Sequence, residues 1–74
     1  MHVSLLGATV SVRIPISTFS QFTPGLIFDL AAHAKGQQFF PGHMSFVFRG
    51  EDWDRLYRAI ELELGITRLV PSIN

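Results

Sequence analysis

Cysteine is absent from the sequence, and charged residues are scarce. Without cysteine, a disulfide framework and a thiolate metal site are both excluded, so the fold must rest on its core or on association. Charged residues make up 16% of the chain, against roughly 25% in typical soluble domains. A chain of 74 residues buries only about 60% of the surface that its unfolded form exposes. We therefore expect a single domain over residues 1–74 that leaves some apolar surface exposed.

Long apolar runs are also missing. The sequence has no run of about 18 apolar residues, the length that a membrane-spanning helix needs. The apolar stretch over residues 3–12 has no basic residue ahead of it and continues into Arg13, which favours a strand over a signal sequence. The sequence therefore predicts a soluble, cytoplasmic protein that does not associate with membranes.

No motif for catalysis or ligand binding is present. A nucleophile elbow, a phosphate-binding glycine loop and the recognised zinc patterns are all absent. Asp29 and His33 have the spacing of two metal ligands on one helix, but a third ligand would have to come from His2 or His43 in distant segments. We therefore predict no metal, no cofactor and no enzymatic activity. A minimal enzyme that uses His33 or His43 stays as the third hypothesis.

Alternating apolar and polar residues predict strands. Residues 9–17 alternate strictly, and a further strand is expected over residues 44–49, with a short one over 66–70. Pro15 cannot donate a ladder hydrogen bond, so its strand should lie at an edge or be open on one side near its end. Residues before Gly7 are expected to extend this strand through a bend. The side chains predicted to point to the core from residues 9–17 are Val10, Val12, Ile14 and Ile16.

Two helices are predicted. Thr23 is a good N-cap and Pro24 suits the first helical position, and Gly36 is expected to end this helix. The second helix covers residues 51–65, where apolar residues fall within an arc of about 100°. These core-facing residues are Trp53, Leu56, Tyr57, Ile60 and Leu64.

The predicted elements follow the order β-α-β-α-β and indicate an α+β fold. The simplest arrangement is a small two-layer sandwich, in which two helices cover one face of a three- or four-stranded, mainly antiparallel sheet. No internal repeat stands out in the sequence. The second face of such a sheet is left without helices and is therefore a candidate contact surface.

A phenylalanine-rich stretch supplies further surface candidates. Pro41 and Gly42 predict a tight turn, and Phe39 and Phe40 come directly before it. Adjacent side chains in extended chain point to opposite faces, so one of these two cannot face the same core as Phe46. The predicted interface consists of the apolar anchors Phe28, Phe39, Phe40 and Val47, with Arg13 and Arg49 to orient a partner.

These features predict a small protein–protein interaction module. It would be a homodimer, or a regulator or inhibitor that docks on a larger protein. The alternative is a nucleic-acid-associated protein, or a decoy inhibitor of a nucleic-acid enzyme as phages and mobile elements use, because residues 51–63 hold five acidic side chains against two arginines. Few cations are available to bind phosphates, so we do not expect nucleic acid as the partner.

Overall fold

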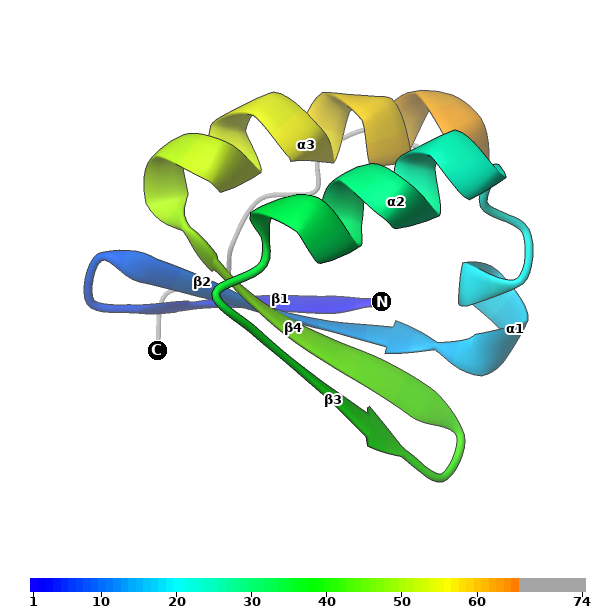
Figure 1. The fold of residues 1–74 in the computed structure, drawn as a ribbon, viewed down its shortest axis with the longest axis horizontal. Coiled ribbons are helices and arrows are strands. Elements are labelled where there is room, and N and C mark those ends of the chain that lie inside the picture. Colours follow the sequence, from blue (N-terminus) through cyan, green and yellow to red (C-terminus); the bar gives the residue numbers. More distant parts are fainter. Residues whose placement is uncertain (66–74) are drawn as a thin grey trace.

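A four-stranded antiparallel sheet forms one layer of the fold, and helices form the other (Figure 1). The structure is a computed structural model that describes residues 1–65. The strands, in sheet order, are β1 (His2–Leu6), β2 (Thr9–Pro15), β4 (His43–Arg49) and β3 (Gly36–Phe40). The helices are α1 (Ile16–Phe19), α2 (Pro24–His33) and α3 (Gly50–Leu64). The predicted α+β class, the antiparallel sheet and the two long helices over one face are confirmed.

Each strand predicted ahead of a helix belongs to a hairpin. β1 turns into β2 at Gly7, where φ is +62°, instead of extending it through a bend. β3 turns into β4 at Pro41 and Gly42, and the φ of +91° at Gly42 suits the predicted turn. The element order is therefore strand, strand, helix, helix, strand, strand, helix. The strand predicted over residues 66–70 lies outside the described residues.

At the end of β2, the prediction that Ile16 faces the core is wrong, and one of the two alternatives predicted for Pro15 is confirmed. β2 lies between β1 and β4, so it is not an edge strand. Pro15 pairs with His43 of β4, whereas the pairing with β1 already ends at Arg13, which leaves the strand open on one side near its end. Ile16 does not continue the strand toward the core. It begins α1, is 36% exposed, and donates its N–H to the carbonyl oxygen of Gly42 at 3.0 Å.

Thr23 begins α2 as predicted. Its hydroxyl oxygen accepts a hydrogen bond from the N–H of Leu26 at 3.3 Å. The N–H and the hydroxyl of Thr23 also donate to the two carboxylate oxygens of Glu63 in α3, at 2.9 and 2.8 Å. The helix ends at His33, earlier than predicted, because Gly36 already belongs to β3. This network fixes the start of α2 against the end of α3.

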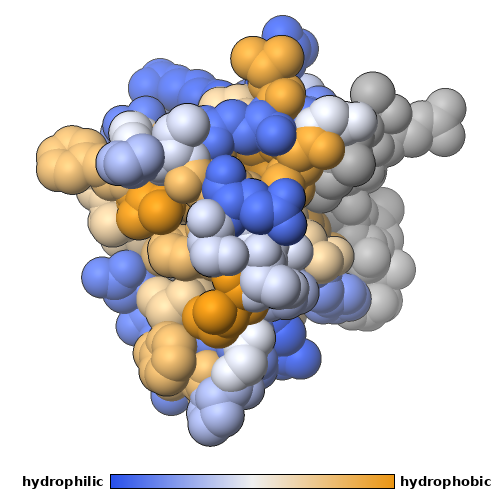
Figure 2. Space-filling model, turned by 90° about the vertical axis from the view of Figure 1, so that its right-hand side faces the viewer, coloured by the Kyte–Doolittle hydropathy of each residue, from blue (hydrophilic) through white to orange (hydrophobic). Residues whose placement is uncertain are grey.

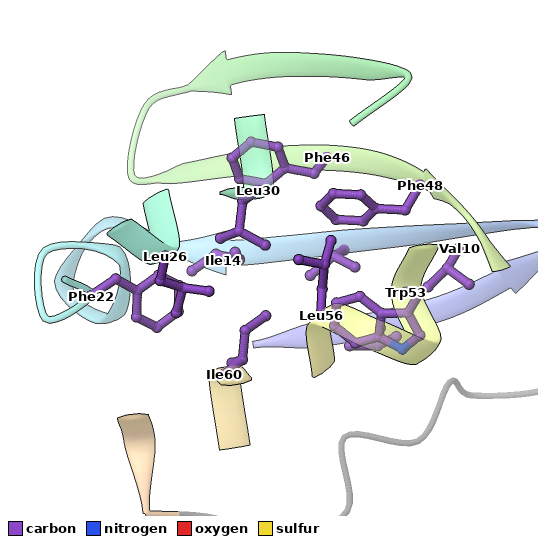
Figure 3. Close-up of a cluster of buried hydrophobic side chains, with 12 residues drawn as sticks. Val10, Ile14, Phe22, Leu26, Leu30, Phe46, Phe48, Trp53, Leu56 and Ile60 are labelled. Carbon is purple, nitrogen blue, oxygen red and sulfur yellow. The ribbon is translucent and has the colours of Figure 1, made fainter. Parts of the chain in front are cut away.

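The core lies between the sheet and the helices (Figure 3). An aromatic row runs through it, in which the ring centroids of Phe19, Phe46, Phe48 and Trp53 follow one another at 6.1, 5.8 and 5.9 Å. Burial of Trp53 confirms the predicted inner side of α3. The buried apolar residues are Val3, Val10, Val12, Ile14, Phe22, Leu26, Leu30, Phe46, Phe48, Trp53, Leu56 and Ile60.

The two halves of the described chain fold alike, although no repeat stands out in the sequence. The N–H of Ile16 donates to the oxygen of Gly42 at 3.0 Å, and the N–H of Gly50 donates to the oxygen of Ala8 at 3.1 Å. Adding 34 to the residue number of the first donor gives the second donor, and subtracting 34 from the first acceptor gives the second acceptor. We call this relation the half-to-half offset. It makes α3 the counterpart of α1 and α2 together, and it indicates a pseudo-two-fold axis normal to the sheet.

Burial follows the same offset. At the axis, Val12 pairs with Phe46 across β2 and β4, and both side chains are buried. Further counterparts are buried in both halves, namely Ile14 with Phe48, Phe22 with Leu56, and Leu26 with Ile60. Exposed positions match too, because Phe28 in α2 and Leu62 in α3 are counterparts and are 72% and 84% exposed. The repeat therefore lies in the pattern of burial.

Candidate functional site

One face of the sheet is covered by none of the described helices. Along β2, Val10 and Val12 point toward the helices, so Ser11 and Arg13 point away from them. The same alternation and the strand register assign the other members of this surface, which we call the open face. They are His2, Ser4 and Leu6 of β1, Thr9, Ser11, Arg13 and Pro15 of β2, His43, Ser45, Val47 and Arg49 of β4, and Gly36, Gln38 and Phe40 of β3.

Arg13 and Arg49 both lie on the open face and are both exposed. In the register Arg13 pairs with Ser45 and Arg49 pairs with Thr9, which separates the two guanidinium-bearing positions by roughly 13 Å along the strands. None of the four strands contains a carboxylate, because the six acidic residues lie in α2 and α3. Acidic side chains are therefore confined to the helix layer, whereas the only charged side chains on the four strands are those of Arg13 and Arg49, apart from the histidines.

Phe40 and Val47 share the open face with the two arginines. Val47 is half-buried in the middle of the face, between Ser11 of β2 and Gly36 of β3. Phe40 is half-buried and stacks on His43, with the ring centroids 4.9 Å apart. Four of the six predicted interface residues are thus brought onto one surface.

Phe39 and Phe28 lie elsewhere. Phe39 points to the helix side of the sheet, but β3 is an outer strand and the side chain stays 66% exposed. The expectation that Phe39 and Phe40 point to opposite faces is confirmed. Phe28 projects from α2 in the helix layer, so it does not join the open face.

Sequence reasoning missed the two most exposed leucines of the described residues. Leu62 in α3 and Leu6 in β1 are 84% and 61% exposed. For Leu62 the signal was present, since it falls outside the apolar arc of its helix. Figure 2 views the side of α1 and of the β3–β4 turn, where apolar side chains reach the surface at several points with polar side chains between them. Exposed apolar surface is thus divided among separate places.

Two shallow hollows are lined mainly by open-face residues. One, of about 330 Å³, is lined by Met1, His2, Arg13, Pro15, Gly42 and His43. The other, of about 210 Å³, is lined by Gly36, Gln37, Gln38, Ser45 and Val47. The polar groups of both hollows are guanidinium, imidazole, amide and hydroxyl groups, without a carboxylate. Such groups donate hydrogen bonds and suit an anionic or acceptor-rich ligand.

The histidines proposed for metal binding or catalysis are not assembled with further ligands. His33 is exposed on α2, near Asp29, while His43 lies on the open face against Phe40. Within residues 1–65 no three ligating side chains gather in one place. Among the described helices, none has the length and apolar character to cross a membrane.

Comparison of the chain with protein-family models, with curated proteins and with solved structures finds no match. The functional argument therefore depends on the surfaces of the molecule.

Proposed function

We propose that the protein is a cytoplasmic, non-enzymatic interaction module that docks its open face on an acidic surface of a larger protein, as a regulator or inhibitor. The observation that supports this proposal is the division of charge between the two layers. Arg13 and Arg49 lie on the open face and Lys35 directly precedes β3, whereas every acidic side chain belongs to α2 or α3.

The chemistry of the open face suits a carboxylate-bearing protein. Arginine forms paired hydrogen bonds with a carboxylate, in a planar geometry that lysine cannot match. Ser4, Ser11 and Ser45 are small, so they allow a partner to approach the middle of the sheet closely. Val47 adds apolar contact at the centre. Arginine and apolar side chains together are typical of protein interfaces.

The opposite layer gives the docking its direction. α3 carries five acidic side chains against two arginines, so it repels an acidic partner. Complementary charge on one layer and like charge on the other favour a single orientation of encounter. The proposed mechanism is steric, since a partner surface held against the sheet is covered and cannot bind anything else.

A peptide-binding experiment tests the proposal. The probes are a short fluorescent polyglutamate and an oligothymidine of equal length, each titrated with the protein at low salt and at physiological salt. We expect polyglutamate to bind at low salt, and we expect its affinity to fall as the salt concentration rises. The double substitution Arg13→Ser with Arg49→Ser should reduce the affinity by about tenfold or more, because each removes a charge-assisted contact.

The matched control is Arg55→Ser with Arg58→Ser, which makes the same change of charge on α3. This control should leave polyglutamate binding nearly intact at physiological salt, because the charges removed lie on the other layer and are screened. Circular dichroism should show that both double variants are folded. Absence of polyglutamate binding at low salt, or equal loss in both double variants, would contradict the proposal. Tighter binding of oligothymidine than of polyglutamate would favour nucleic acid as the partner instead.

A further inference from the structure

Within residues 1–65, β3 is an outer strand whose second edge is unpaired. Among the described elements it pairs only with β4, and Figure 1 shows it at the border of the sheet. None of its residues, Gly36–Phe40, is buried. Proteins usually protect such edges with lysine, proline or a bulge, yet the strand sequence GQQFF contains no charge and no proline. We infer that β3 pairs with β3 of a second copy, in antiparallel orientation about a two-fold axis at Gln38. This inference does not depend on the proposed docking.

The register follows from the strand itself. An antiparallel pairing centred on Gln38 uses all five residues, placing Gly36 opposite Phe40, Gln37 opposite Phe39, and Gln38 opposite its own copy. Lys35 then faces Pro41, so no like charges meet. A slip by one residue would pair open-face side chains with helix-side ones and place the helices of the two copies on opposite faces. The centred register keeps both helix layers on one side and joins the two open faces into one surface.

Gly36 provides the space that this pairing needs. A Cβ atom built on Gly36 would meet no atom within 4 Å. The adjoining hollow of about 210 Å³, lined also by Gln38, Ser45 and Val47, opens on the same face of the sheet as Phe40. A partner's Phe40 ring can therefore lie over this glycine, a cross-strand arrangement in which an aromatic side chain covers the bare backbone. The two-fold axis of the dimer produces two such contacts, one from the Phe40 ring of each copy.

Phe39 makes the corresponding contact on the helix side. It is 66% exposed in the single chain, and the centred register places it opposite Gln37 of the second copy. Its ring can cover the methylene groups of that glutamine, again twice per dimer. The strand is thus self-complementary in shape and in charge. Because five residues on each side bury little area, we expect a weak dimer whose population depends on protein concentration.

Gln38 is the position at which this dimer is tested most directly. Mass is measured by light scattering or sedimentation over a range of concentrations. We expect the average mass of the natural protein to rise toward that of two chains. Gln38→Lys places two like charges opposite each other at the axis and should weaken association by about tenfold or more. Gly36→Val should also weaken it by filling the hollow, while the monomer has room for the side chain.

A cross-linking experiment uses the absence of natural cysteine. Gln38→Cys places two thiols opposite each other, near the separation that a disulfide requires. Under mild oxidation this variant should form a covalent dimer much faster than Gln21→Cys, an exposed control away from β3. Equal cross-linking rates, or a constant single-chain mass at all concentrations, would overturn the inference. So would association that neither Gln38→Lys nor Gly36→Val weakens. The double substitution Arg13→Ser with Arg49→Ser leaves every residue of β3 unchanged, so the mass of that variant tests the dimer separately from the proposed docking.

Discussion

The two halves of the described chain share a core and differ in their helices. In the first half a break at residues 20–23 separates α1 from α2, whereas the second half has the single continuous helix α3. The break is encoded locally, since Thr23 caps a helix that starts at Pro24, and proline is tolerated in the first turn but not in the interior of a helix. The counterparts by the half-to-half offset, Tyr57 and Arg58, let α3 continue.

The comparison separates what the fold requires from what is specific to each half. Eight of the twelve buried residues form four pairs that repeat with the offset, and the two residues differ in every pair. The packing therefore requires apolar volume at these places rather than particular side chains. Charge does not repeat. α2 contains one acidic residue, whereas α3 contains five acidic residues and two arginines. The features on which the functional proposals rest therefore lie outside the repeated pattern.

The largest expected effect is at the pseudo-two-fold axis. Phe46 and its counterpart Val12 are 1% and 0% exposed, but Phe46 is much the larger. We expect Phe46→Ala to cost about 3 to 5 kcal/mol and Val12→Ala about 2 kcal/mol. The total stability of a domain of this size is roughly 4 to 11 kcal/mol, so Phe46→Ala should leave a large unfolded fraction. Urea denaturation followed by circular dichroism measures both. Equal costs would show that the axis is not packed as described.

A second test compares buried and exposed members of the repeated pattern. Leu56 is 7% exposed and Leu62 is 84% exposed on the same helix. Leu56→Ala should cost about 2 to 5 kcal/mol, and Leu62→Ala less than about 0.5 kcal/mol. The offset predicts the same contrast between Phe22→Ala and Phe28→Ala in the first half. If Phe28→Ala destabilised the fold as much as Phe22→Ala, the correspondence of the halves would be wrong.

Local patterns in the sequence were enough to predict much of this fold. Three predictions followed from local rules, and each is confirmed. They are the alternation of apolar and polar residues up to Ile14, the N-cap at Thr23 and the apolar arc of α3. Ile16 was placed wrongly because alternation alone does not reveal where a chain leaves the sheet. Pro15 fits an inner strand through the second arrangement that the sequence allowed, in which the strand is open on one side near its end. Proline restricts only one backbone group, and β1 stops before reaching it.

The candidate site was less accessible to such reasoning. The alternation along each strand predicted that Phe39 and Phe40 separate and that Arg13 and Arg49 point away from the core. Only the β2–β4 register shows where the two arginines lie relative to each other on that face. The same holds for the space beside Gly36, which depends on what the neighbouring strand carries. Nothing in the sequence alone brings segments so far apart in the chain into one surface.

A smaller effect is expected where the halves are joined asymmetrically. Glu63 accepts two hydrogen bonds from Thr23, whose hydroxyl also caps α2. Thr23→Ala removes the cap and one of the bonds to Glu63, and should cost about 0.5 to 2 kcal/mol. Glu63→Gln keeps an acceptor for the backbone N–H and should cost less. Thermal denaturation of both variants gives the order. A larger loss in Glu63→Gln would mean that the carboxylate, not the cap, stabilises the junction.

The smallest expected effect distinguishes the two hairpin turns. Gly7 has a φ of +62°, a left-handed value that asparagine also adopts, whereas Gly42 has a φ of +91° next to Pro41. Neither glycine has an atom within 4 Å of a built Cβ, so backbone strain alone decides the cost. We expect Gly42→Ala to destabilise the protein by about 1 kcal/mol and Gly7→Asn by only a few tenths, roughly. Urea midpoints of the two variants measure the difference. Because the turns are counterparts by the offset, a Gly7→Asn cost equal to that of Gly42→Ala would show that both turns need glycine, and the hairpins would then be more alike than their backbone angles indicate.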